Sequence, residues 1–241
     1  MYKHTYKNYI FDLYGTLVNI HTNEKKKYLW DKLALFYRFQ GANYQPLELK
    51  NEYKRLCDLL EEKLTNVDYP EIEITKVFQM LFQNKSIDAN LQLAKETGTI
   101  FRALSIQDIG LYDGVIDLLD ELQKKDKKIY LLSNAQQIFT EPEMKMLDIY
   151  DYFDGILFSS DQGCKKPSPL LYQAILQKYN LCKEDSIMIG NDYIADIKGA
   201  NTIGLSSLYI HSNLSPNIED ELLSNYSIMD GDVNKIKKMI L

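Results

Sequence analysis

Hydrophobic residues follow two different periods along the chain. A short apolar run at residues 9–11 is rich in β-forming side chains, which is typical of a buried strand. From about residue 24 to 105, apolar residues instead recur at helical spacing, with charged residues between them. This stretch predicts a bundle of about four helices and no strand. Its inward-facing residues fall into the groups Leu29, Leu33, Phe36 and Tyr37; Leu56, Leu59, Leu60 and Leu64; Val77, Met80 and Leu81; and Ile100, Phe101 and Leu104.

From Tyr112 onward the pattern alternates between helices and strands. Asp113 is expected to cap one of these helices, and Ser168 to cap another that has Pro169 at its first position. A last amphipathic helix is expected from Asp232. The short apolar runs predict strands at residues 129–132, 155–158, 186–189, 206–210 and 226–229.

Alternating strands and helices are typical of a parallel sheet with helices on both faces and right-handed crossovers. We therefore predict an α/β protein with a doubly wound, Rossmann-like parallel sheet and an inserted helical-bundle cap. The expected catalytic core comprises residues 1–18 and 109–241, and the cap comprises residues 19–108. Hinges between the two are expected near residues 18–23 and 106–113.

Composition narrows the classes of partner. A net charge of −6 disfavours nucleic acid, because binding to phosphates needs a basic face. No apolar run reaches the roughly 18 residues of a membrane span, and the first residues lack the apolar centre of a signal peptide. The cysteines are far apart and odd in number, which predicts reduced thiols in a cytoplasmic protein.

Polar side chains follow several of the predicted strands at the point where each strand ends. Asp12 comes directly after the first strand, and Ser133 and Asn134 follow the strand at 129–132. Lys166 lies beyond the next strand, and Asp192 follows the strand at 186–189. Because the carboxyl ends of parallel strands meet at one edge of a sheet, we expect these side chains to share one crevice.

These polar side chains together suit the transfer of an anionic group. A carboxylate can act as a nucleophile, and a hydroxyl and an amide can hold an anion together with backbone N–H groups. A lysine can neutralise charge on the nucleophile and on the group being transferred. Two carboxylates, Asp12 and Asp192, offer the hard oxygen ligands that Mg²⁺ prefers. Gly15 permits a tight turn after Asp12, and Thr16 places a hydroxyl beside it.

These motifs, in this order, resemble the haloacid dehalogenase-like hydrolase superfamily. The inserted helices match the cap position of its dehalogenase/phosphoglycolate-phosphatase branch. The resemblance covers the whole predicted core and indicates the superfamily, although it does not indicate a substrate. It rests on DLYGTL at residues 12–17, LLSN at 131–134, Lys166–Pro167, and IGND at 189–192 with Asp196 and Gly199–Ala200.

The resemblance implies a hydrolase with a covalent aspartyl intermediate, first of all a Mg²⁺-dependent phosphatase acting on a small phosphorylated metabolite. Asp12 would be the nucleophile, and Lys166 would stabilise both Asp12 and the transition state. The implied anion-holding residues are Thr16, Ser133 and Asn134. The implied metal ligands are Asp12, the backbone carbonyl of Tyr14, and Asp192.

Tyr14 departs from the phosphatase pattern. Phosphatases of this superfamily usually carry a second Asp at this position, which protonates the leaving group and later activates water. A phenol is a poor base at neutral pH, so its presence could cost about 10²–10⁴ in rate. The superfamily's 2-haloacid dehalogenases also carry Tyr here, and their leaving halide needs no proton.

The fourth motif favours the phosphatases, because the dehalogenases do not use a metal and lack its paired acids. Asp192 and Asp196 are spaced to share one helix face. A motif with five-residue spacing would instead place the metal ligand at Asn191. Asp196 would then orient Lys166 or a metal-bound water, or it would be a solvated helical residue.

Three functions therefore remain open: a Mg²⁺-dependent phosphatase, a carbon–halogen hydrolase, and a non-catalytic protein that binds a phosphorylated metabolite or a protein partner. A dehalogenase is expected to place an arginine near the start of the cap as a carboxylate clamp. Residues 21–30 contain lysines and no arginine. Arg38, Arg55 and Arg102 lie deeper in the predicted cap.

Overall fold

The computed structural model describes residues 5–241 and contains a six-stranded sheet at its centre. The strands are all parallel and lie in the order β5-β4-β1-β6-β7-β8. They are β1 (Asn8–Phe11), β4 (Lys128–Ser133), β5 (Gly155–Phe158), β6 (Ser186–Gly190), β7 (Ser206–Ile210) and β8 (Tyr226–Ile228). The predicted α/β class and each predicted strand are confirmed.

The central place of β1 follows from its composition. Tyr9, Ile10 and Phe11 have no exposed surface, which suits a strand that is covered on both faces. Phe11 pairs with Leu131 of β4 on one side and with Ile189 of β6 on the other. The residues that follow these three strands therefore leave the sheet at the same edge.

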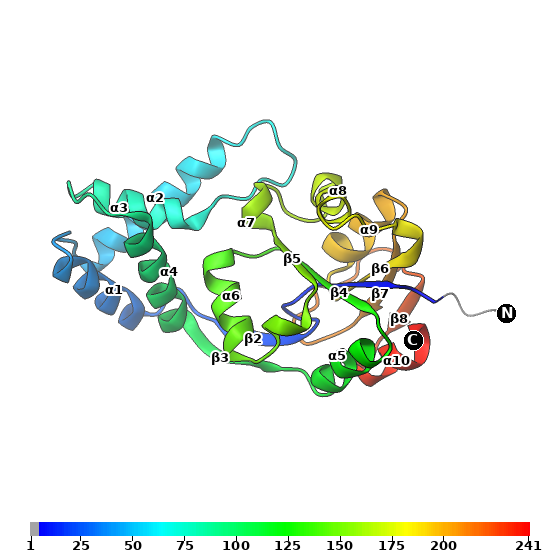
Figure 1. Cartoon of the computed structure of the whole chain (residues 1–241). Coiled ribbons are helices and arrows are strands. Elements are labelled where there is room, and N and C mark those ends of the chain that lie inside the picture. The colour runs from blue at the N-terminus through cyan, green and yellow to red at the C-terminus, as the bar shows by residue number, and fades with distance from the viewer. Residues whose placement is uncertain (1–4) are drawn as a thin grey trace.

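Helices cover both faces of the sheet, as Figure 1 shows. Helices α5 (Val115–Lys124) and α10 (Asn234–Ile240) pack on one face, and α8 (Pro169–Lys178) and α9 (Gly199–Thr202) pack on the other. The remaining helices of this part are α6 (Gln137–Met146), α7 (Ser159–Gln162), the 3₁₀ turns η1 (Tyr150–Tyr152) and η2 (Lys183–Asp185), and the π-helical turn η3 (Tyr193–Lys198).

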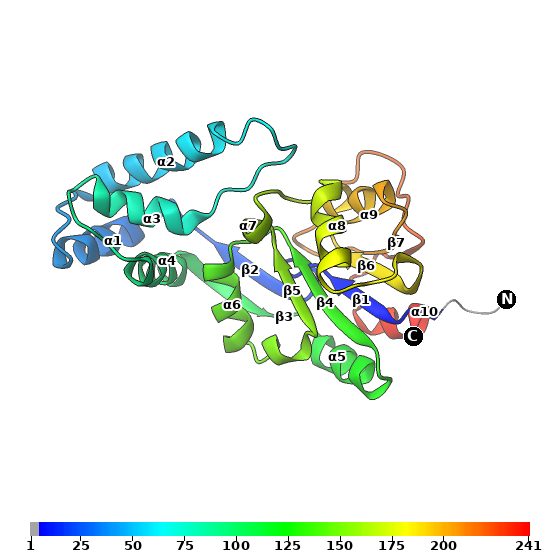
Figure 2. The same ribbon diagram turned by 45° about the horizontal axis from the view of Figure 1, so that its top comes forward.

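The helical segment between β1 and α5 forms a separate layer to one side of the sheet, as Figure 2 shows. Its members are α1 (Lys27–Phe39), α2 (Pro46–Glu62), α3 (Ile74–Gln83) and α4 (Leu91–Ser105). They enclose their own hydrophobic cluster, in which the rings of Trp30, Tyr53, Phe78 and Phe101 are in contact. Phe139 of α6 completes this cluster from the other part of the protein.

An antiparallel ribbon connects the helical segment to the rest of the protein, where the sequence pattern predicted only hinges. It pairs β2 (Val18–Thr22) with β3 (Ile106–Leu111). The ribbon crosses both predicted domain boundaries, so the division at residues 18/19 and 108/109 stays a prediction. The two strands form a two-stranded sheet of their own and are partly exposed, and they therefore lack the continuous apolar run that identified the central strands.

Two local predictions are corrected by the structure. Asp113 does not cap α5, because the residue preceding that helix is Gly114, whose φ of 87° is in the left-handed region that favours glycine. Leu64 lies beyond the end of α2 at Glu62. The helix after Ser168 does begin with Pro169, although the Ser168 side chain makes no capping hydrogen bond.

Two further observations concern predictions made from composition. Cys57, Cys164 and Cys182 are all free thiols. Among residues 5–241, no helix is long and apolar enough to cross a membrane.

Candidate active site

The loops after β1, β4, β5 and β6 meet in one cavity of about 150 Å³. The cavity lies at the carboxyl edge of the sheet, where parallel α/β sheets bind their ligands. The sequence-predicted residues that line it are Asp12, Tyr14, Ser133, Asn134, Lys166, Asn191, Asp192 and Asp196, and they are joined by Ala195, Leu214 and Pro216. The predicted convergence of these side chains is therefore observed.

Lys166 is the centre of the charged cluster. Its Nζ donates to Asp12 Oδ1 at 2.7 Å, to Asp196 Oδ1 at 2.7 Å and to the carbonyl of Leu132 at 2.8 Å. Lys166 is 3% exposed and Asp196 is fully buried, so neither charge is solvated by bulk water. Asp12 is 7% exposed, which leaves the nucleophile candidate in contact with the cavity.

Burial and neighbouring charges shift the pKa values of Lys166 and Asp196 in opposite directions. Burial disfavours the ammonium form of Lys166, but the charges of Asp12 and Asp196 outweigh burial and raise the pKa of Lys166 above its ordinary value. Burial raises the pKa of Asp196, and the adjacent Lys166 opposes this effect. Lys166 is therefore a fixed cation beside Asp12, and Asp196 is a positioning partner of that cation. This favours the alternative in which Asp196 orients Lys166.

The side chain of Asn134 positions Lys166 by binding the Lys166 backbone. The Asn134 amide accepts a hydrogen bond from the Lys166 N–H at 2.7 Å and donates to the Lys166 carbonyl at 3.0 Å. Ser133, by contrast, turns its hydroxyl toward Asp12 Oδ1 at 3.3 Å. The predicted contact of Asn134 with a bound anion stays a prediction.

Thr16 and Asn191 form the opposite side of the Asp12 carboxylate. Thr16 Oγ1 lies 3.3 Å from Asp12 Oδ2 and 3.3 Å from Asn191 Oδ1. Gly15, with a φ of 87°, allows this approach, because a Cβ there would meet the Asn191 side chain at 2.2 Å. The amide oxygen of Asn191 is thus close to the nucleophile candidate.

Asp192 is directed toward the following turn. Its Oδ1 accepts hydrogen bonds from the N–H groups of Ile194 and Ala195, both at 2.9 Å, so Asp192 caps η3. Asp196 Oδ2 in turn accepts from the Asp192 N–H at 2.9 Å. The carboxylate of Asp192 therefore lies at the cavity wall, and its Oδ1 is already bound to the backbone N–H groups of η3.

The donor set fits a magnesium ion. Among residues 5–241, no cluster of three or more His, Cys, Asp and Glu side chains is arranged to hold a metal. Mg²⁺, however, is commonly held by one or two carboxylates with substrate oxygens and waters. The cavity offers carboxylate, amide and carbonyl oxygens. Its three carboxylates and one ammonium give a formal charge of −2, which a divalent cation neutralises.

The side chain of Tyr14 is engaged away from Asp12. Its hydroxyl contacts Thr140 Oγ1 at 3.0 Å and donates a short hydrogen bond to Glu143 Oε2, and both partners are on α6. Burial, reinforced by Glu143, raises the pKa of the Tyr14 hydroxyl well above its ordinary value. Tyr14 is therefore a weaker proton donor than a solvated phenol, and its hydroxyl is directed to α6.

Arg102 joins this cluster from α4. Its Nε lies 2.5 Å from Glu143 Oε1, and its guanidinium stacks over the rings of Tyr14 and Phe139. The Arg102 and Glu143 side chains are 15% and 6% exposed. Arg102 is thus paired with a carboxylate and is not among the residues that line the cavity, so it does not offer the clamp expected of a dehalogenase.

Tyr14→Phe is expected to leave turnover unchanged and to lower the free energy of unfolding by about 1–3 kcal/mol, because Thr140 and Glu143 lose a buried partner. Urea denaturation and steady-state kinetics on the same preparations check this expectation. A large loss of kcat without loss of stability would show that the hydroxyl takes part in the chemistry.

A second contact holds the helical segment against the loops of the site. Glu71 accepts hydrogen bonds from Gln136 at 3.0 Å and from Ser159 at 2.8 Å. Its neighbour Pro70 pairs with Cys164, close to Lys166 in sequence. Burial raises the pKa of Glu71. The helical segment therefore contacts the segments that carry the Ser133 and Lys166 motifs.

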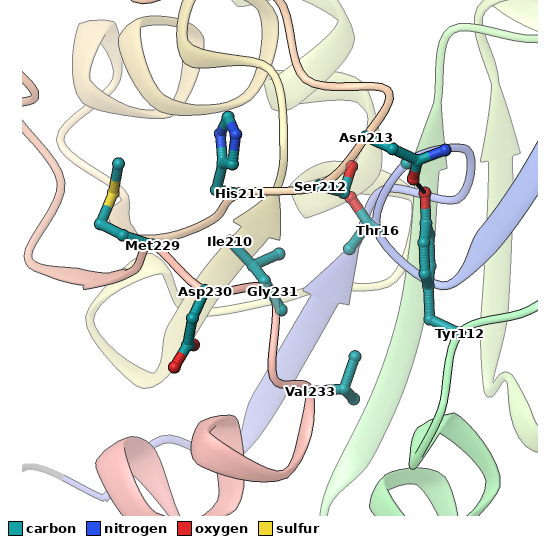
Figure 3. Close-up of a pocket in the computed structure, with 11 residues that line it drawn as sticks. Thr16, Tyr112, Ile210, His211, Ser212, Asn213, Met229, Asp230, Gly231 and Val233 are labelled. Atoms are coloured by element: carbon teal, nitrogen blue, oxygen red, sulfur yellow. Dashed lines mark hydrogen bonds between the residues drawn. The ribbon is translucent and has the colours of Figure 1, made fainter.

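A larger pocket of about 350 Å³ lies beside the site, at the ends of β7 and β8 (Figure 3). It shares Gly15 and Thr16 with the loop that carries Asp12, and Ile210 and Val233 lie on its apolar side. Of the predicted site residues, it contains Thr16 alone.

Sequence reasoning missed Glu143, Thr140, Leu214 and Pro216. The signal for Glu143 was a charged residue on the inward face of α6, between the buried residues Phe139 and Met144. Leu214 and Pro216 lie in an irregular loop, where periodicity gives no indication of which side chains face a cavity.

Comparison with known proteins identifies the family of the chain. The model of the haloacid dehalogenase-like hydrolase family matches residues 6–204. The chain belongs to this family of hydrolases, as the resemblance of its motifs predicted.

Two relatives, one of which has a solved structure, illustrate the range of the family. The chain is 24% identical to the glyceraldehyde 3-phosphate phosphatase of Methanothermobacter thermautotrophicus, over 81% of this chain and 84% of that protein. It is 25% identical to the HAD-hydrolase YfnB of Bacillus subtilis, over 92% and 91%. A magnesium-bound structure of YfnB covers 98% of this chain and 99% of its own, with a TM-score of 0.56.

The fold is shared equally with dehalogenases. The 2-haloacid dehalogenase of Pseudomonas syringae has a TM-score of 0.61 at 18% identity, and the match covers 93% of this chain and 94% of that one. Structural likeness therefore confirms the fold, and the choice of reaction depends on the residues of the site.

Proposed function

We propose that this protein is a Mg²⁺-dependent phosphatase that hydrolyses small phosphorylated metabolites through an aspartyl phosphate on Asp12. One observation carries the proposal: a buried ammonium, Lys166, bridges Asp12 and Asp196 at 2.7 Å each, at the edge of the sheet where ligands bind. The lysine places a positive charge beside Asp12, which lines the cavity. A carboxylate held in this position is placed to act as a nucleophile.

In the first step, a carboxylate oxygen of Asp12 attacks phosphorus, and the bond to the leaving oxygen breaks with its electron pair. Ser133 and Thr16 orient the Asp12 carboxylate, and Lys166 offsets the charge that develops beside it. In the second step, water attacks the phosphorus of the aspartyl phosphate. Asp12 leaves as a carboxylate, and orthophosphate takes the proton.

Magnesium, when bound, supplies electrostatic stabilisation of the phosphoryl oxygens. We propose that Asp12, the Tyr14 carbonyl and Asp192 hold it, with Asn191 as the alternative to Asp192. Support comes from the formal charge of the cavity and from the magnesium-bound structure of the relative YfnB. Release of phosphate from acetyl phosphate, measured with Mg²⁺ and again with EDTA, tests this part of the proposal: turnover should stop when the metal is removed.

Asn191→Asp is expected to lower the Mg²⁺ concentration required for half-maximal rate by about tenfold, because a carboxylate would replace the amide oxygen near Asp12. The matched control is Asn66→Asp, which adds the same charge in an exposed loop of the helical segment. A requirement for Mg²⁺ that is unchanged in Asn191→Asp would show that residue 191 is not at the metal.

The preferred leaving groups follow from Tyr14. With no carboxylic acid at that position, a leaving group must depart without a proton. We therefore propose that acyl phosphates and aryl phosphates are hydrolysed faster than alkyl phosphates. The relatives that are glyceraldehyde 3-phosphate phosphatases support a phosphorylated substrate. They do not identify the compound that this protein hydrolyses.

A second candidate, hydrolysis of a carbon–halogen bond, is favoured by Tyr14 itself. The pairing of Arg102 with Glu143 speaks against it, because that guanidinium is not available to a substrate carboxylate. Chloride release from 2-chloropropionate tests it. Release that persists in EDTA would replace the phosphatase proposal with this one.

A further inference from the structure

The connection between α2 and α3 extends from the helical segment to the loops of the site, as Figure 2 shows. Its backbone pairs with the residues that directly precede Lys166. The Lys165 N–H donates to the Tyr69 carbonyl at 2.7 Å. The Glu71 N–H donates to the Gly163 carbonyl at 3.0 Å. Main-chain hydrogen bonds therefore join the helical segment to the stretch that leads into Lys166.

The side chain of Gln136 binds the same connection from a second loop of the site. Its Nε2 donates to Glu71 Oε1 at 3.0 Å and to the Ile72 carbonyl at 2.8 Å, and its Oε1 accepts from the Ile74 N–H at 3.0 Å. Gln136 lies two residues beyond Asn134 in the sequence. The connection is thus bonded to both of the loops that converge on the nucleophile candidate.

Glu71 also reaches the second loop through a buried hydroxyl. Its Oε2 accepts a hydrogen bond from Ser159 Oγ at 2.8 Å. Ser159 is fully buried, and its Oγ accepts from the Ala135 N–H at 2.9 Å. A hydroxyl that donates its proton to the carboxylate has its lone pairs free for that N–H. Glu71 is therefore linked, through one hydroxyl, to the backbone of the residue that follows Asn134.

The two loops determine where the groups beside Asp12 lie. The Asn134 side chain binds both the N–H and the carbonyl of Lys166, and Lys166 Nζ lies 2.7 Å from Asp12 Oδ1. Ser133, which precedes Asn134, places its hydroxyl 3.3 Å from the same oxygen. A shift of either loop would move an ammonium or a hydroxyl that contacts Asp12. A displacement of about 1 Å in a catalytic group can cost about 100-fold in rate.

We propose that Glu71 is a positioning residue, which holds the loops that carry Asn134 and Lys166 in their catalytic arrangement. This inference rests on the proposed phosphatase function and adds that the activity depends on the helical segment. The site has its full catalytic geometry only while the α2–α3 connection is docked. Glu71 is not among the residues that line the cavity, so it acts through Ser159 and the loops and not on the substrate.

Steady-state kinetics with acetyl phosphate give the first test. Glu71→Ala is expected to lower kcat by about 10–100-fold, the usual cost of losing a residue that orients a functional group from behind. KM should stay nearly unchanged, because the groups that Glu71 positions act on the transition state. Glu71→Gln keeps the shape of the side chain and one acceptor oxygen, so it should fold as the wild type does and lose less. The matched control is Asp68→Asn, which removes a carboxylate from an exposed position of the same connection and should change neither constant.

A double variant distinguishes positioning from general loosening of the structure. Because Glu71 acts through Ser159, the kcat of Glu71→Ala/Ser159→Ala should be close to that of the more impaired single variant. A kcat reduced by the product of the two separate losses would show that the residues act independently, and it would overturn the proposed linkage.

Hydrogen exchange measured by NMR tests the positioning without any turnover. In Glu71→Ala, the N–H groups of Ala135 and Lys166, both bonded to side chains, should exchange faster than in the wild type and in Asp68→Asn. Unchanged exchange overturns the proposal, and so does an unchanged kcat in a folded Glu71→Ala. If exchange responds as expected but the wild type does not hydrolyse acetyl phosphate, the phosphatase function is refuted and the placement of the loops by Glu71 is supported.

Discussion

Lys166→Met is expected to destabilise the protein by about 3–5 kcal/mol and to abolish phosphatase activity. The variant leaves the carboxylates of Asp12 and Asp196 buried without the cation that both contact at 2.7 Å. Removal of one partner of a buried charge cluster costs far more than the cluster contributes to stability, because the remaining charges stay desolvated. Urea denaturation measures the loss.

The pH dependence of this loss identifies its cause. Burial raises the pKa of Asp196, and without Lys166 the main group that opposes this rise is lost, so the native state would bind more protons than the unfolded chain. Stability then falls as pH rises above the unfolded pKa of an aspartate. We therefore expect the deficit of Lys166→Met relative to wild type to be larger at neutral pH than in mild acid. A deficit that grows on acidification would contradict this assignment.

The neighbouring residue supplies a matched control. Lys165 is partly exposed, and its Nζ is 3.9 Å from Glu61. Lys165→Met should cost at most about 1 kcal/mol, as is usual for an exposed ion pair.

A double variant separates the two carboxylates that contact Lys166. In Lys166→Met/Asp196→Asn, one of the two buried charges left without a partner is removed, so part of the stability should return while activity stays absent. Recovery of activity would show that Lys166 acts only as a counter-ion to Asp196.

Tyr14→Asp is expected to raise kcat for alkyl phosphates by about 10²–10⁴, the usual contribution of a positioned general acid–base group. Position 14 lines the cavity beside Asp12, and the residue present there directs its hydroxyl to α6. The gain should be small for acetyl phosphate, whose leaving carboxylate needs no proton. The rates for glycerol 3-phosphate and acetyl phosphate, measured in parallel, give the comparison.

Tyr14→Phe is the control, because it removes the hydroxyl and adds no acid. A similar gain in Tyr14→Phe and Tyr14→Asp would attribute the effect to loosened packing between α4 and α6. No gain in Tyr14→Asp, in a variant shown to fold, would mean that another group already supplies the proton. That outcome would remove the predicted preference for leaving groups that depart unprotonated.

The central sheet could be predicted from the sequence because its strands are short apolar runs, several of which are followed closely by polar residues. Asp12 after β1 and Asn191 and Asp192 after β6 are examples. The parallel order then required these residues to share one edge, and the cavity contains them. The β2–β3 ribbon escaped prediction because Asn19, His21 and Thr22 interrupt its apolar pattern.

The environment of Tyr14 could not be predicted, since it depends on contacts between residues far apart in the chain. Arg102 and Glu143 are separated by 41 positions, and Tyr14 precedes Glu143 by 129. Each residue alone has an ordinary explanation as a helical surface charge or a core aromatic side chain. Only the packing of α4 against α6 brings the three together and shows that the tyrosine hydroxyl is engaged in structure.

Hydrolysis of acetyl phosphate by the wild type and by Asp12→Asn, each with saturating Mg²⁺, tests the central claim most directly. The claim predicts steady release of phosphate by the wild type and no release above background by Asp12→Asn, with both proteins equally folded by circular dichroism. Equal turnover by the two proteins, or none by the wild type, would contradict the assignment of Asp12 as the nucleophile of a phosphatase.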